Sequence, residues 1–144
     1  MSGVFTELDH AADLFLEVHG RDLDGLFENA LYAFYSEAVD LGLVTGREKS
    51  TIRIREGSLD AALRSLLAEA LYRLDADSFA AASARVKVLR ENGDTIRVTA
   101  TLWGGSLVET SGARLTEIKA VTYHRLAVSQ IPGGGWKATV LFDV

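Results

Sequence analysis

Residues 136–144 read WKATVLFDV, and this stretch decides the fold because apolar and polar side chains alternate in it at the period of a β-strand. The side chains on one face of such a strand are apolar: Trp136, Ala138, Val140 and Phe142. An apolar face ties a terminal strand to the core, whereas most chain ends fray. The strand ends on Asp143 and Val144, so we expect a side-chain carboxylate and the α-carboxylate of the last residue at a fixed place on the surface.

The sequence before this strand is also rich in period-two patterns. The expected strands of the C-terminal half are residues 85–90, 95–103 and 119–130. Asn92-Gly93 lies between the first two, and this dipeptide between alternating runs predicts a β-hairpin. Pro132 and the glycines that follow it predict a turn into the terminal strand. Residues 104–118, rich in Gly, Ser and Thr, predict a loop.

The N-terminal half combines short strands with two amphipathic helices. The expected strands are residues 4–6, 13–19 and 50–55. Asp22 and Ser58 each precede apolar residues at helical spacing, so we expect them to cap the two helices. The pattern predicts an α+β fold over residues 1–144: a single two-layer domain, with two helices packed on one face of a mixed, largely antiparallel sheet.

Composition narrows the class of protein. The chain has 144 residues, 48% of them hydrophobic and 24% charged, which is typical of a globular domain. No apolar run approaches the roughly 18 residues of a membrane helix, there is no cysteine, and the N-terminus lacks the features of a signal peptide. We therefore expect a cytoplasmic protein without a membrane partner. The net charge of −5 argues against a broad nucleic-acid surface, so RNA would be contacted only through another protein.

Three short polar segments carry the chemistry. Residues 9–13 read DHAAD, residues 117–124 read EIKAVTYH, and the chain closes on Phe142-Asp143-Val144. Each has an ordinary structural interpretation when it is taken alone. The first can be a capped corner, the second a strand edge with ordinary polar side chains, and the third an exposed chain end.

Together, in this order and at this length, the three segments resemble the archease family. The family's usual forms are DHTADIG, E-x-K-A-x-T-Y-H, and a final W-x-A-x-x-x-x-D followed by an aliphatic residue. The resemblance covers essentially the whole chain, and its last two motifs are quite specific. The sequence departs from the pattern at three places: Ala11 replaces a common threonine, Phe15 a common glycine, and Gly105-Ser106 a frequent Gly-Glu pair.

The resemblance implies an accessory protein rather than an enzyme. Archeases are cofactors of the RtcB-type RNA ligase, which joins RNA ends in tRNA splicing and RNA repair. They promote guanylylation of the ligase and allow multiple turnover. The family also binds a divalent metal, associated with calcium, and the matching positions here are Asp13, Asp143 and Val144.

The chemistry of these three residues agrees with such a metal. They offer only oxygen ligands, which suit Ca²⁺, and also Mg²⁺ or Mn²⁺, better than zinc or copper. We expect four further residues to contact the ligase on the same surface: His10, Lys119, Tyr123 and His124. If residues 119–130 form one strand, Tyr123 and His124 lie on opposite faces, and we expect one of them to be packed inside or held by a structural hydrogen bond.

Two other functions fit the sequence less well. One is an independent hydrolase or transferase in which His124 works with Lys119 or Glu117 as general acid and base. The other is a general chaperone-like interaction module, which requires a sizeable exposed apolar patch.

Overall fold

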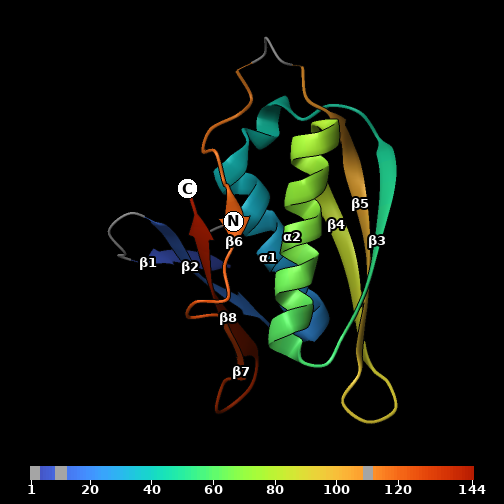
Figure 1. The fold of residues 1–144 in the computed structure, drawn as a ribbon, viewed down its shortest axis with the longest axis vertical. Helices are drawn as coiled ribbons and strands as arrows, with labels where there is room; N and C mark the ends of the chain where they lie inside the picture. The colour runs from blue at the N-terminus through green and yellow to red at the C-terminus, as the bar shows by residue number, and fades with distance from the viewer. Residues whose placement is uncertain (1–3, 9–12, 109–111) are drawn as a thin grey trace.

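The computed structural model describes residues 4–8, 13–108 and 112–144 (Figure 1). Within these residues, two α-helices, one short 3₁₀-helix and eight strands follow one another in the order β1 Phe5–Leu8, β2 Asp13–Gly20, α1 Leu23–Ala38, η1 Leu41–Leu43, β3 Glu48–Glu56, α2 Leu59–Asp77, β4 Phe79–Arg90, β5 Ile96–Ser106, β6 Ala120–Val121, β7 Ala127–Gln130 and β8 Trp136–Asp143. None of the described helices is both long and apolar enough to cross a membrane.

The α+β class is confirmed, but the strands form two sheets where the sequence predicts one. Strands β1, β2, β8 and β6 are neighbours in that order in a five-stranded sheet, in which β7 also pairs with β8. Strands β3, β5 and β4 form a separate three-stranded sheet, and every strand pair is antiparallel. Period-two alternation identifies strands but does not say which strands pair, and this is why the sequence does not separate the two sheets.

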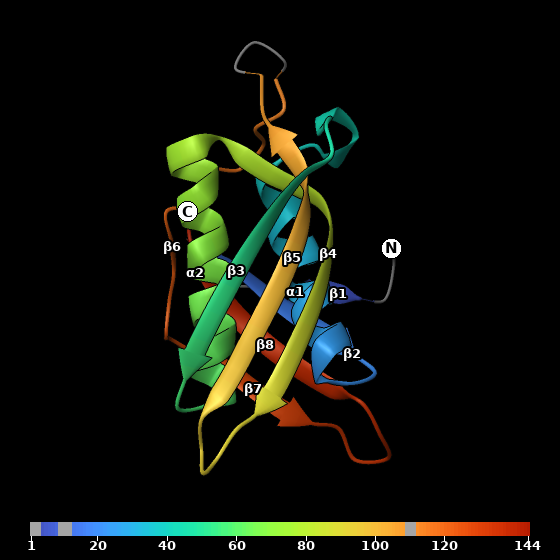
Figure 2. The ribbon, with the colours of Figure 1, turned by 90° about the vertical axis from the view of Figure 1, so that its right-hand side faces the viewer.

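The helices lie between the two sheets and pack on both of them (Figures 1 and 2). Helix α1 contacts β2 and β4, and helix α2 contacts β3 and β6. Both predicted caps are confirmed: the carboxylate of Asp22 accepts a hydrogen bond from Gly25 N at 2.7 Å, and the hydroxyl of Ser58 accepts one from Ala61 N at 3.1 Å.

Helix α1 also supplies acceptors to the open edge of the three-stranded sheet. Strand β4 is an end strand of this sheet, so half of its backbone donors have no strand partner. Asp24 accepts a hydrogen bond from Val88 N and Glu28 accepts one from Val86 N, both at 2.8 Å. The two carboxylates are four residues apart on α1, so one face of the helix follows the edge of the strand.

The predicted loop at 104–118 begins too early. Strand β5 continues through Gly104 and Gly105 to Ser106. Glycine is required there because a Cβ atom at residue 104 would lie 2.0 Å from the carbonyl oxygen of Ala80, and one at residue 105 would lie 2.3 Å from that of Thr45. Glycine in a strand marks such a close backbone approach as well as a loop, and the sequence does not distinguish the two.

The predicted strand at 119–130 is wrong as one element. The chain forms β6, leaves the sheet in a turn around residues 123–125, and returns as β7. Arg125 has a φ of 58°, in the left-handed region that a strand does not use. Both short strands pair with β8 on the side opposite β2.

Candidate functional site

Strand β8 lies inside the five-stranded sheet, so its last residue has neighbours on both sides (Figure 1). Asp13, the first residue of β2, is directly opposite Asp143. Ala120, the first residue of β6, is opposite Asp143 on the other side. Directly opposite residues of an antiparallel pair have Cβ atoms about 4.5–5.5 Å apart. The structure therefore brings together the two predicted carboxylates, which come from opposite ends of the sequence.

The core fixes which face of the sheet carries this pair. Leu14 and Phe142 are buried, 8% and 1% exposed, and are directly opposite each other. Because side chains alternate along a strand, the adjoining Asp13 and Asp143 lie on the opposite face, away from the helices. Asp13 is half-buried and Asp143 is exposed, while Val144 retains 36% of its exposure.

Backbone hydrogen bonds fasten the end of β8 to the segment that holds the second motif. Lys119 N donates to the carbonyl oxygen of Asp143 at 2.7 Å. Thr122 donates twice to the carbonyl oxygen of Leu141, from its N and its Oγ1, both at 3.0 Å. No side chain among residues 4–8, 13–108 and 112–144 donates a hydrogen bond to the Asp143 carboxylate, so that carboxylate faces solvent with its acceptors available.

The donor set fits a hard, oxygen-preferring cation. It consists of the carboxylates of Asp13 and Asp143 and a main-chain oxygen of Val144. In the described part of the chain, no three His, Cys, Asp or Glu side chains gather in a group that could hold a metal ion. Two carboxylates leave coordination positions for water or for ligands from another protein, a pattern that suits Ca²⁺, Mg²⁺ or Mn²⁺.

Lys119 joins this region through its backbone, and the residue is exposed and lines a cavity of about 650 Å³. Glu117, Arg114 and Asp75 also line this cavity, which lies between the end of α2 and the segment that leads into β6. His124 is not one of its lining residues. The three groups of the predicted acid–base alternative therefore do not all line this cavity.

Tyr123 and His124 lie in the turn between β6 and β7, and neither is packed inside. The other expected arrangement, a structural hydrogen bond, is present for Tyr123, because its hydroxyl oxygen accepts a hydrogen bond from Arg64 Nη1 at 3.2 Å. Tyr123 is 67% exposed, and His124 is exposed as well. A turn has no strand parity, so neighbouring side chains in it can both face solvent. His10, the fourth predicted contact residue, lies outside the described residues.

Two arginines that the sequence did not single out contact aromatic rings here, one beside the turn and one within it. Arg64, on α2, has its Cζ atom 4.3 Å from the centroid of the Tyr123 ring. Arg125 has its Cζ atom 5.1 Å from the centroid of the Phe15 ring. Arg64 is far from the turn in the sequence and occupies an ordinary polar position on a helix, so nothing in the pattern points to its role. Arg125 adjoins the motif at residues 117–124 but lies outside it.

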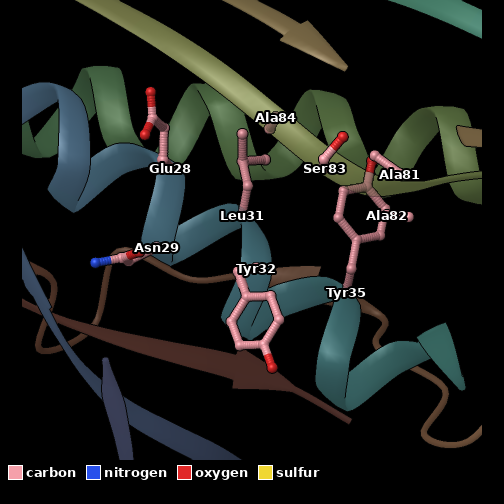
Figure 3. Close-up of a pocket in the computed structure, with 9 residues that line it drawn as sticks. All are labelled: Glu28, Asn29, Leu31, Tyr32, Tyr35, Ala81, Ala82, Ser83 and Ala84. Atoms are coloured by element: carbon pink, nitrogen blue, oxygen red, sulfur yellow. The ribbon is translucent and has the colours of Figure 1, made fainter. Parts of the chain in front are cut away.

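A further cavity, of about 310 Å³, lies between α1 and β4 (Figure 3). Tyr32 and Tyr35 of α1 and the small side chains of residues 81–84 line it. None of the described residues of the predicted site reaches this cavity, so we do not assign it to the same surface.

The comparisons with known proteins agree with the motifs. The family model described as Archease protein family (MTH1598/TM1083) matches residues 5–144. The chain belongs to the archease family. Proteins named protein archease from Methanosarcina barkeri and Archaeoglobus fulgidus are 32% and 33% identical to it; each alignment covers 95% of this chain, with 93% and 96% of the relative.

Solved structures of similar proteins share the fold. The solution structure of Methanobacterium thermoautotrophicum protein 1598 has a TM-score of 0.81 and 28% identity, with 98% of this chain and 99% of that chain covered. The crystal structure of an archease from Thermotoga maritima, described as a possible chaperone, has a TM-score of 0.62 and 23% identity over 96% of each chain. The two-sheet α+β architecture is thus the architecture of archease structures.

Proposed function

We propose that this archease is a metal-binding accessory protein that activates an RtcB-type RNA ligase in tRNA splicing and RNA repair. It promotes guanylylation of the ligase and multiple turnover, and it meets RNA only through the ligase. The observation that supports this proposal best is the position of Asp13 directly opposite Asp143, at the end of a strand anchored in the core.

The residues of this chain hold the acidic end in place. Phe142 is buried beneath the helices, and the Asp143 carbonyl is bound by Lys119 N, so the backbone of Asp143 cannot move away from Asp13 without breaking the sheet. A bound divalent cation would supply positive charge for oxygen ligands of the partner. Because this chain offers so few ligands, we propose that the ion is shared with the ligase and is held weakly without it.

A ligase guanylylation assay tests the proposal. RtcB-type ligase from the same organism is supplied with its nucleotide and an RNA substrate, with and without this protein at equal concentration. We expect guanylylation to be faster and ligation to continue beyond one turnover when the protein is present. An unchanged turnover would refute the assignment.

The Asp143→Ala variant tests the acidic end within the same assay. Loss of one of two ligand carboxylates removes the site, so we expect stimulation to fall to about the level without the protein. Asp94→Ala is the matched control, because Asp94 is an exposed aspartate in the turn between β4 and β5, away from the site. Removal of Val144 should act like Asp143→Ala. Full stimulation by either site variant would contradict the proposal.

A chaperone-like module is the second candidate, since the Thermotoga maritima relative is described as a possible chaperone. The exposed large apolar side chains of the described residues come from several elements: Leu43, Tyr72, Leu89, Val108, Leu115, Tyr123 and Val144. Such a module would bind its partners equally well with and without divalent metal. Partner binding that disappears with a chelator separates the two functions.

A further inference from the structure

The turn between β6 and β7 presents Tyr123 to solvent, yet the structure holds this side chain in a defined position. A tyrosine that is 67% exposed ordinarily samples several rotamers. Here Arg64 of α2 lies against the ring: its Cζ atom is 4.3 Å from the ring centroid, and its Nη1 donates to the hydroxyl oxygen at 3.2 Å. Stacking and a hydrogen bond from one planar guanidinium fix both the plane and the direction of the ring.

The guanidinium is itself anchored to the backbone. Arg64 Nε donates to the carbonyl oxygen of Val121 at 3.0 Å, on the open edge of β6. One turn earlier on α2, the carboxylate of Asp60 accepts from Val128 N at 2.8 Å, on the edge of β7. Two side chains four residues apart on one helix therefore hold the strands on both sides of the turn.

The other end of the turn is fixed to the outer face of the five-stranded sheet. Arg125 adopts φ 58° and lies over the ring of Phe15, 5.1 Å from its centroid. The Arg125 carbonyl oxygen accepts a hydrogen bond from Thr139 Oγ1 at 2.7 Å. Phe15 is two residues from Asp13 on the same face of β2, so the Arg125 end of the turn lies on the face that carries the acidic pair, while Tyr123 at the other end contacts α2.

We propose that Arg64 is a positioning residue that holds Tyr123 ready as an anchor for the partner ligase. This inference rests on the proposed function and adds a contact to it. Aromatic side chains held in one conformation are favoured at interface hot spots because little rotamer entropy is lost on binding. Arg64 covers one side of the ring and donates to the hydroxyl oxygen, so the Tyr123 O–H remains a donor. The partner chemistry that fits is a shallow apolar pocket ending in a carbonyl or carboxylate acceptor.

The first test needs no ligase. NMR couplings measure the order of the Tyr123 side chain about χ1 in the wild type and in Arg64→Ala. We expect one dominant rotamer in the wild type and several in the variant, because Asp60 and Thr139 still hold the backbone of the turn. Arg73→Ala is the matched control, because Arg73 lies on the same helix but binds Glu69 and Ser50, away from the turn. Unchanged order in Arg64→Ala would overturn the positioning role.

The second test measures partner binding. The concentration of protein that gives half-maximal stimulation of the ligase should rise about 10-fold for Arg64→Ala and for Tyr123→Ala, while the maximal stimulation stays the same because the acidic end is intact. Arg64→Lys retains a cation but not the planar fork, so its half-maximal concentration should lie between those of the wild type and Arg64→Ala. The double variant should be no weaker than Tyr123→Ala, because Arg64 acts through Tyr123.

The outcomes separate this inference from the proposed function. If Asp143→Ala abolishes stimulation while Tyr123→Ala leaves the half-maximal concentration unchanged, the activation stands and the anchor is refuted. If the effects of Arg64→Ala and Tyr123→Ala add fully, Arg64 contacts the partner itself and the positioning role is refuted. If the wild type does not stimulate the ligase at all, the proposed function fails, and the NMR result still decides whether Arg64 orders the Tyr123 side chain.

Discussion

Tyr35 places a hydroxyl group in the core without a hydrogen-bond partner among the described residues. The residue is 1% exposed. Burial raises the pKa of Tyr35 above its ordinary value of 10.0. A buried hydroxyl without a partner costs about 1–3 kcal/mol of desolvation free energy.

We therefore predict that Tyr35→Phe raises the free energy of unfolding by about 1 kcal/mol, measured by urea denaturation. Tyr72→Phe, at a position that is 63% exposed, should change it little. Because the folded pKa of Tyr35 is raised, the wild type should lose stability relative to Tyr35→Phe as the pH rises above 10. A loss of 1 kcal/mol or more in Tyr35→Phe at neutral pH would contradict this account, since it would show that the hydroxyl is hydrogen-bonded.

At the scale of residues, the sequence correctly predicted features that depend only on residues close together in the chain. The caps at Asp22 and Ser58 are confirmed because a cap is defined by a residue and the backbone three positions later. The contact between Arg64 and Tyr123 could not be predicted, because it joins α2 to a turn 59 positions away. Only the packing of α2 on the edge of β6 places them together.

At the scale of elements, Gly104 shows why β5 was predicted too short. A glycine pair in a period-two run indicates either a loop or a strand pressed against another backbone. Here the carbonyl of Ala80 occupies the space of a side chain. The strand could be extended correctly only with knowledge of the β4–β5 register, which shifts between Ala81 and Ser83.

This close approach gives a prediction about stability. Gly104→Ala should lower the free energy of unfolding by roughly 1–3 kcal/mol, because the new Cβ atom would lie 2.0 Å from a backbone oxygen and β4 must move. Gly57→Ala is the matched control, because a Cβ atom there meets nothing within 4 Å. Thermal unfolding of both variants measures the difference. Equal stability of the two would contradict the close approach.

At the scale of the whole molecule, the α+β class followed from the sequence, but the division into two sheets did not. Each strand was recognisable by its own alternation, while pairing depends on contacts between distant segments. The opposition of Asp13 and Asp143 follows from one such pairing, between β2 and β8. The resemblance of the sequence to a family was the reason to expect that these two acids meet. The structure supplies the strand register that brings them together.

The central claim is that Asp13, Asp143 and Val144 form a site for a hard divalent cation. An NMR titration with Ca²⁺ tests it most directly, because a weak site of this kind binds on the order of 10⁻⁴–10⁻³ M and shifts the amide signals around it. We predict saturable shifts at Asp13, Lys119 and Asp143 in the wild type, and none of them in the Asp143→Asn variant. Shifts that are absent at millimolar Ca²⁺, or identical in the variant, would contradict the claim.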